Sequence, residues 1–393
     1  MKNKVFGIFK KAAAFLLAAV LMLSFAACKD NGVSEKPDDV VLPEKKVAIL
    51  VAPESQYPED YRAAKELAEK YPDNVIVKEY SDSRVLRAGD PEIKQYSKEL
   101  AENSEIGAII YARATQFTTN AIAAAKEVNP DIVTVCIEPE ESVEKISEAA
   151  DLVLCADWSK AAEDIVAAAK EQGAKYFVVY SFNRHITNNP LIRAENDAIK
   201  TACEAQGITY IYESSLDPIY PTLGNASKYI KESVARLINN NAIEGKDVVL
   251  FSTDGTVQST LVEVANEKGF IYICPSFPTA YNGIGEVYEA AMPESVNDTA
   301  AYIASLKAAV EADTAGAARL NVYSFPLASK LLTGALYSAF DILSGTTTAD
   351  NLAEKVQSRV SAAADNEKFT VEAYNTVLKN TFKAYCPGFE KIK

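Results

Sequence analysis

Two kinds of side chain that could hold a small molecule follow the predicted strands of this sequence. One kind is planar and could stack on a ring: Tyr57, Tyr111, Trp158, Phe182 and Phe277. The other kind could hydrogen-bond polar atoms: Arg113, Gln116, Glu138, Asn183, Arg184 and Asp254. Small-molecule sites combine apolar surface with a few directed polar groups, and bonds made by charged groups are the stronger ones. The combination predicts a polar, ring-containing ligand such as a sugar or a nucleoside.

Several of these residues also have a structural interpretation. Trp158 could pack at a hinge, and the two tyrosines could be half-buried rings at the rim of a cleft. Asp254 is also a favoured helix N-cap residue, and capping does not exclude ligand contact. His185 is best read as an ordinary loop histidine, and Asn183 and Arg184 could be solvated loop residues. Arg113 could be a surface residue or pair with an acid in the cleft.

The elements that would position these residues alternate along the chain. Short β-branched runs alternate with longer segments of helical apolar spacing, which is typical of parallel sheets covered on both faces. The first series predicts strands at 47–51, 74–79, 106–111, 131–136 and 152–155, and the second at 176–180, 208–212, 248–251 and 270–274. Helices are expected between them and, in the tail, at 327–343, 350–364 and 371–384.

The fold class predicted is α/β, with two doubly wound parallel-sheet lobes joined by a hinge. We expect lobe 1 to comprise residues 46–156 plus 291–322, and lobe 2 residues 157–290 plus 323–393. The hinge segments would lie near 156–158, 290–296 and 318–323. Ligands bind beyond the carboxyl ends of the strands in such sheets, so the residues above would line one cleft.

The amino terminus has the layout of a secretory signal. Four lysines precede an uncharged run from Ala12 to Ala27, and small residues stand before Cys28. The segment Phe25-Ala26-Ala27-Cys28 resembles a bacterial lipoprotein signal, which implies that residues 1–27 are removed and that Cys28 receives the lipid. The alternative is an uncleaved anchor helix, but the run has about 16 residues and a spanning helix needs roughly 20. Residues 28–45 are polar and predict a flexible spacer.

Charge and cysteine content exclude several classes of function. The formal charge is −14, and removing residues 1–27 removes four lysines and no acids, which makes it −18. Such a surface repels nucleic acid and anionic lipid, so no nucleic-acid partner is expected. The five other cysteines (Cys136, Cys155, Cys203, Cys274, Cys386) show no C-x-x-C spacing and favour free thiols, with a Cys136–Cys155 disulfide as the alternative. The single histidine excludes multi-histidine zinc sites, and no metal or cofactor is expected.

Catalytic signatures are few. The chain has no G-x-S-x-G elbow and no phosphate-binding P-loop motif. The pair Glu138 and Glu140 could do acid–base chemistry, although such acids are more often solvated loop ends. An enzyme is therefore the third-ranked alternative, and its turnover would depend on His185 or Glu138.

A lipoprotein signal, a spacer and two successive α/β lobes together resemble the type I periplasmic binding proteins. The resemblance covers residues 46–345 in element order and is similar to sugar- and nucleoside-binding members and to a poorly characterised group of Gram-positive lipoproteins. The segment Phe251-Ser252-Thr253-Asp254-Gly255-Thr256 looks like the family's strand-to-helix corner, where Asp254 would face the ligand. The tail beyond Ser344 is longer than in a typical sugar-binding member.

The resemblance implies a function outside the cytoplasm. The protein would be lipid-anchored to the cell membrane, close over its ligand, and present it to an ABC importer permease or a sensor ectodomain. The second-ranked alternative is a structural or interaction lipoprotein that kept the fold without a ligand.

Overall fold

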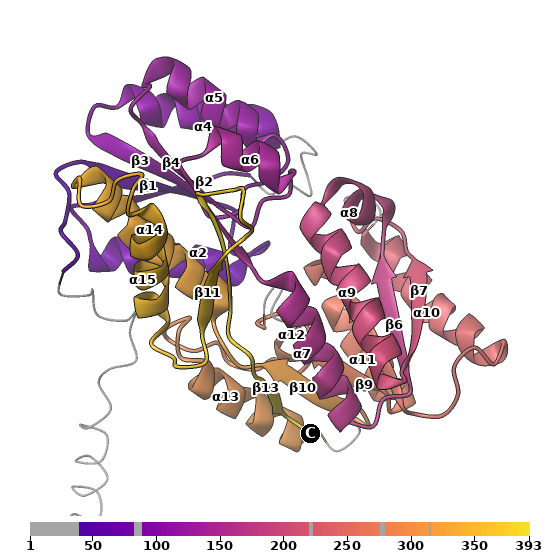
Figure 1. Ribbon diagram of the computed structural model, residues 1–393. Helices are drawn as coiled ribbons and strands as arrows, with labels where there is room; N and C mark the ends of the chain where they lie inside the picture. Colours follow the sequence, from indigo (N-terminus) through magenta and orange to yellow (C-terminus); the bar gives the residue numbers. More distant parts are fainter. Residues whose placement is uncertain (1–38, 82–88, 220–222, 276–279, 314–315) are drawn as a thin grey trace, which may run out of the picture. The chain divides into compact units, whose positions relative to one another are not determined.

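The computed structural model describes residues 39–81, 89–219, 223–275, 280–313 and 316–393 (Figure 1). The expected signal peptide 1–27, the lipidation site Cys28 and most of the expected spacer lie outside these residues. No helix of the described ranges is both long and apolar enough to cross a bilayer.

The first sheet has seven strands in the order β11-β12-β5-β4-β3-β1-β2. Its parallel strands are β1 (Lys46–Val51), β2 (Val75–Glu79), β3 (Ile106–Tyr111), β4 (Val133–Ile137), β5 (Leu152–Ala156) and β12 (Thr381–Tyr385). The edge strand β11 (Thr370–Ala373) pairs antiparallel to β12. The central strands are buried on both faces, which explains their continuous apolar runs.

Helices cover both faces of this sheet (Figure 1). One face packs against α4 (Gly89–Glu102), α5 (Thr118–Val128) and α6 (Val143–Ala149). The other packs against α2 (Pro58–Lys70) and α14 (Leu327–Leu343), and α15 (Leu352–Ala364) lies on α14. Gly334 brings the last two helices close, because a Cβ there would lie 2.8 Å from the Cα of Val360.

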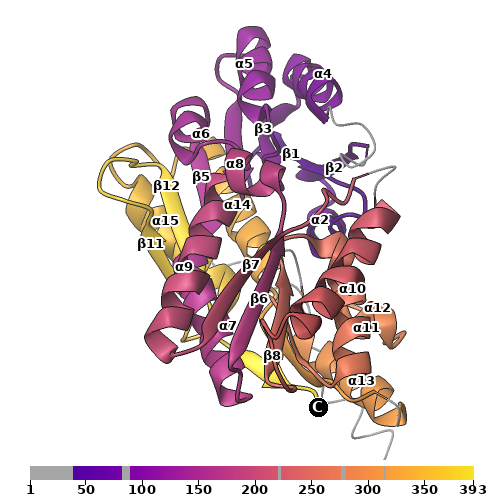
Figure 2. The same ribbon diagram turned by 90° about the vertical axis from the view of Figure 1, so that its right-hand side faces the viewer.

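The second sheet has six strands in the order β13-β10-β9-β8-β6-β7. They are β6 (Tyr176–Ser181), β7 (Thr209–Ser214), β8 (Val248–Ser252), β9 (Ile271–Cys274), β10 (Arg319–Tyr323) and the antiparallel β13 (Phe389–Lys391). Helices α7 (Trp158–Glu171) and α9 (Pro190–Gln206) cover one face, and α10 (Leu223–Asn239) and α11 (Gln258–Lys268) cover the other (Figure 2). Shorter elements complete this half: α8 (Asn183–Asn188), the 3₁₀ turn η1 (Gly255–Val257), α12 (Ile284–Val287) and α13 (Thr299–Ala312).

The two-lobe α/β prediction is confirmed, but the expected exchange of segments is wrong. Strand β10 pairs with β9, so the chain around 319–323 belongs to the second half and not to lobe 1. Helix α14 and strands β11 and β12 belong to the first half, so most of 323–393 does not belong to lobe 2. Within the described residues the chain passes between the sheets at Asp157, at Ser324–Pro326 and at Cys386–Gly388. The predicted crossing near 156–158 is thus confirmed, and the one near 318–323 lies directly before the observed crossing at Ser324–Pro326. The crossing predicted at 290–296 does not occur.

Two further expectations fail at the ends. Residues 371–384 form the hairpin of β11 and β12 rather than a helix, because β-forming Thr381, Phe382 and Tyr385 extend the edge left by β5. Residues 39–45 are not a free spacer. Val40 is 1% exposed, and Asp39 accepts a hydrogen bond from the buried guanidinium of Arg359 at 2.6 Å.

The five cysteines of the described residues are buried free thiols, so the alternative of a Cys136–Cys155 disulfide is excluded.

Candidate functional site

A cavity of about 740 Å³ lies at the carboxyl ends of strands from both sheets. The first half contributes the loops after β1, β3, β4 and β5, and the second contributes α8, part of α9, and the loops after β7 and β8. This is the place where open α/β sheets bind ligands, because the loops there can vary while the strands hold them.

The structure brings nine of the eleven predicted residues to this cavity: Tyr57, Arg113, Gln116, Glu138, Trp158, Phe182, Asn183, Arg184 and Asp254. Tyr111 is a correction. Its ring lies in the core between β3 and α4, and its hydroxyl donates to Ser97 Oγ at 2.9 Å. Tyr111 lies within β3, and its side chain points toward α4. Arg113 lies beyond the strand end, where the pleat no longer sets the side-chain direction, and it lines the cavity. Phe277 lies outside the described residues.

Arg113 forms a buried ion pair at the floor of the cavity. Its Nε donates to Asp60 Oδ2 at 2.8 Å, and both side chains are less than a tenth exposed. The guanidinium lies 4.6 Å from the centre of the Tyr57 ring, in cation–π geometry. Burial raises the pKa of Asp60, and the charge of Arg113 opposes that rise. The charge of Arg113 is therefore already balanced by this chain.

Glu138 joins the first half to the beginning of α7. Its carboxylate accepts hydrogen bonds from the Ala156 backbone N–H and from Trp158 Nε1, the latter at 3.1 Å. Burial raises the pKa of Glu138 to about 7, against the opposing effect of Arg113. Its φ of 48° is unusual for a residue with a side chain, and such backbone strain is concentrated at functional sites.

Glu195 is a cavity residue that the sequence patterns above did not single out. It lies on α9, lines the cavity and is only 4% exposed. Among the described residues its carboxyl group has no hydrogen-bond or ion-pair partner. Burial raises the pKa of Glu195 well above its ordinary value, and the charge of Glu138 adds to the rise. The available signal was its place on the apolar face of α9, between Leu191 and Ile199.

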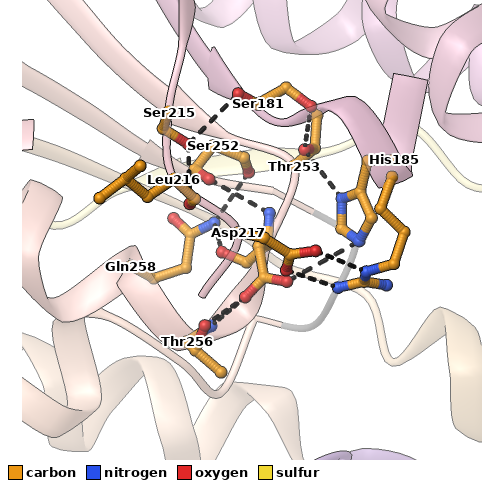
Figure 3. A network of polar contacts seen from close by, with 11 residues as sticks. Ser181, His185, Ser215, Leu216, Asp217, Ser252, Thr253, Thr256 and Gln258 are labelled. Carbon is orange, nitrogen blue, oxygen red and sulfur yellow. Dashed lines mark hydrogen bonds and ion pairs between the residues drawn. The ribbon is translucent and has the colours of Figure 1, made fainter. Parts of the chain in front are cut away.

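The second half surrounds its part of the cavity with a polar network (Figure 3). Arg184 makes two parallel bonds to Asp217, at 2.9 and 3.0 Å, and its guanidinium lies 5.0 Å from the Phe182 ring centre. Asp254 accepts a hydrogen bond from the Thr256 N–H at 2.9 Å and thereby caps η1. The same residue also lines the cavity. Gln258 donates to the carbonyl oxygens of both Ser252 and Asp254.

His185 is part of this network and is not a free loop residue. Its Nδ1 lies 3.1 Å from Thr253 Oγ1, and its ring packs on Phe182 with the ring centres 4.0 Å apart and the planes tilted by 37°. Burial, with help from the charge of Arg184, lowers the pKa of His185 to about 3. The ring is neutral at physiological pH, so its 3.8 Å approach to Asp254 is not an ion pair there.

The cavity has an excess of acidic groups. Of the residues that the structure describes, six carboxyl groups line it, from Glu138, Glu140, Glu195, Asp217, Asp254 and Glu286, against the two guanidiniums of Arg113 and Arg184. Both guanidiniums already have a carboxylate partner. Among the described residues, no group of three His, Cys, Asp or Glu side chains could hold a metal ion.

Comparisons with known sequences give a family and two relatives. A family model described as "Protein of unknown function (DUF3798)" matches residues 45–321. An uncharacterized protein of Treponema pallidum (strain Nichols) is 26% identical over 175 residues, which are 44% of this chain and 79% of that protein. A second one from the same organism is 30% identical over 118 residues, 30% of this chain and 53% of that protein.

Solved structures share the fold at low sequence identity. A putative transcriptional regulator from Clostridium difficile 630 aligns with a TM-score of 0.68 and 16% identity, over 89% of this chain and 100% of that one. An ABC transporter solute binding protein from Clostridium phytofermentas with bound L-rhamnose aligns with a TM-score of 0.54 and 12% identity, over 88% of this chain and 96% of that one. The expected resemblance to type I solute-binding proteins is confirmed at the level of fold.

Proposed function

We propose that this chain, which belongs to the family described as protein of unknown function (DUF3798), is an extracytoplasmic solute-binding protein for a small polar ligand. The observation that carries the proposal is the cavity of about 740 Å³ to which both halves contribute rings and directed polar groups. Tyr57 supplies a ring from the first half, Phe182 supplies one from the second, and Trp158 supplies a third from the start of α7, where the chain crosses. A sugar- or nucleoside-like ligand matches this combination, because its ring can stack while its hydroxyls bond the polar groups.

Closure over the ligand is the expected mechanism. Three chain segments connect the halves, so a small rotation about them would bring the two walls of the cavity together. A ligand that binds the closed form more tightly shifts the population toward it. A membrane partner, an ABC importer permease or a sensor ectodomain, would then recognise the closed form, with Cys28 as the lipid attachment site.

The charge of the chain argues against one other function. The regulator from Clostridium difficile shares the fold, but a formal charge of −14 disfavours nucleic-acid contact by this chain. The likeness is one of fold, and the ligand-binding role remains the better supported interpretation.

Two measurements test the proposal. Mass spectrometry of small molecules released from gently purified protein should show a bound polar compound. Isothermal titration against sugars and nucleosides should then give saturable heats, and Trp158→Leu should weaken binding roughly tenfold through the loss of stacking area. Tyr229→Leu, which removes a ring on α10 away from the cavity, is the control. Binding only to amino acids or peptides, or to nothing, would refute the proposal.

A further inference from the structure

The part of the cavity beside Trp158 contains carboxyl groups that this chain does not neutralise. Glu195 is only 4% exposed, yet no hydrogen-bond donor of the described residues reaches its carboxyl group. A buried polar group without a partner costs free energy that a packed core normally avoids. The missing partner of Glu195 is therefore best supplied from outside the chain.

Glu138 adds to the same excess of negative charge. Its two donors, the Ala156 N–H and the Trp158 indole, are both uncharged. The two guanidiniums of the cavity are held by Asp60 and Asp217, and so they do not neutralise Glu195. Neither is available to attract an anionic ligand at full strength, which disfavours phosphorylated and carboxylated compounds.

We propose that the ligand is an organic cation, a ring compound bearing a protonated amine, and that Glu195 and Glu138 receive its ammonium group. The inference rests on the proposed function, since it names the ligand class of the same cavity. An ammonium group has three donors and would give Glu195 the partner it lacks. A metal ion does not suit the site, because no three ligating side chains of the described residues converge there. The Trp158 ring offers the cation a second favourable contact through its π face.

Binding of such a ligand should also change the ionisation of Glu138 and Glu195. Burial raises the pKa of Glu138 to about 7, and the charged groups that act on it are Arg113 and Asp60. Glu138 in turn raises the pKa of its neighbours Glu195 and Cys155. A bound ammonium group stabilises the ionised carboxylate, so binding should release protons near neutral pH. Affinity should then rise as the pH increases from 5.5 to 6.5, a range in which the ligand amine stays protonated.

The experiment compares matched neutral and amine-bearing compounds by isothermal titration. Glucosamine is paired with glucose, and 3′-amino-3′-deoxyadenosine with adenosine. We expect the amine of at least one pair to bind roughly tenfold or more tightly than its neutral parent, the scale of a charge-assisted bond. Titration in two buffers of different ionisation enthalpy should show protons released on binding.

Glu195→Gln is the decisive variant, because it removes the charge while keeping the shape. It should abolish most of the preference for the amine and reduce the proton release. Glu204→Gln makes the same charge change on an exposed part of the same helix and should leave binding unchanged. Thermal melting confirms that each variant is folded.

The outcomes separate the two proposals. If the neutral parents bind as tightly as the amines and Glu195→Gln has no effect, the charge inference is wrong while the solute-binding proposal stands. If no compound of either kind binds and purified protein releases none, both proposals fail.

Discussion

Two glutamates lie between the halves of this protein, and their surroundings are opposite. Glu66 on α2 accepts bonds from Ser295 Oγ at 2.9 Å, from the Val296 N–H at 2.7 Å and from Asn297 Nδ2 at 3.3 Å. Glu195 on α9 faces the cavity and has no partner among the described residues. We call the first contact the seam, meaning Arg62 and Glu66 with residues 293–297. Glu66 is bonded by donors of its own chain and therefore makes a structural contact, whereas Glu195 is left for a ligand to bond.

The seam also explains one error of the sequence prediction. Residues 290–296 were expected to cross between lobes, and they do not. They nevertheless contact the first half, because Arg62 donates to the carbonyl oxygens of Pro293 and Glu294. A segment can thus lie at the hinge without passing through it.

The largest expected effect is on stability, and it concerns the buried ion pair between Arg113 and Asp60. Asp60→Asn keeps the shape of the side chain but leaves the buried charge of Arg113 uncompensated. We expect a loss of about 3–5 kcal/mol in the free energy of unfolding, measured by urea denaturation. Asp73→Asn, at an exposed position, should change stability little. A loss below about 1 kcal/mol for Asp60→Asn would mean that the pair is not buried as described.

The next effect is a pair of opposite pH dependences in the ligand-free protein. Glu138 has its pKa raised from 4.5 to about 7, so the folded state binds more protons and its contribution to stability grows as pH falls from 6.5 to 4.5. His185 has its pKa lowered from 6.5 to about 3, so its contribution is lost over the same window. Each contribution is about 2 kcal/mol over these two pH units, with opposite sign.

Single variants should separate the two contributions. Relative to the unchanged protein, Glu138→Gln should lose stability on acidification from pH 6.5 to pH 4.5, because the His185 contribution remains alone. His185→Gln should gain stability over the same range. Urea denaturation at pH 6.5 and at pH 4.5 measures the change in the free energy of unfolding for each variant. Changes of the same sign relative to the unchanged protein would contradict the assignment.

A smaller effect is expected at the seam. Glu66→Gln leaves one good acceptor where two charged oxygens met three donors, so we expect a loss of about 1–2 kcal/mol in stability. Glu69→Gln, exposed on the same helix, is the matched control. If Glu66→Gln also weakened ligand binding more than Glu195→Gln does, the distinction between seam and cavity would fail.

The smallest expected effect is the change in stability caused by Glu195→Gln. Burial raises the pKa of the Glu195 carboxyl group well above its ordinary value, which favours the neutral form in the ligand-free protein. Replacing it by a neutral amide of the same shape should change the free energy of unfolding by less than about 0.5 kcal/mol. A clear destabilisation would show that an internal partner of Glu195 exists, and that the cavity is no less complete than the seam.

The sequence predicted the elements well where local pattern and burial agree. The buried strands are short apolar runs of a kind that few other elements produce, and they place Arg113, Glu138 and Asp254 at strand ends. Pairing between distant segments was not predictable in this way. Strand β10 could have extended either sheet by its own pattern, and α14 could have covered either, since it is apolar nearly all round.

The cavity was predictable only in part for a similar reason. Residues in loops after strands could be placed by position, but Glu195 lies inside a helix and Tyr111 inside a strand. Whether such a residue faces the cavity depends on the direction of its side chain. In a strand, a shift of one residue turns that side chain to the other face.

The sheet pairing bears on how this family can be dissected. The family match ends at residue 321, in the middle of β10. A fragment that stopped there would lose α14, which covers one face of the first sheet, and also β12 and β13, which extend the two sheets. Neither half is contiguous in sequence, so domain boundaries drawn from family models alone would yield truncated, aggregation-prone pieces.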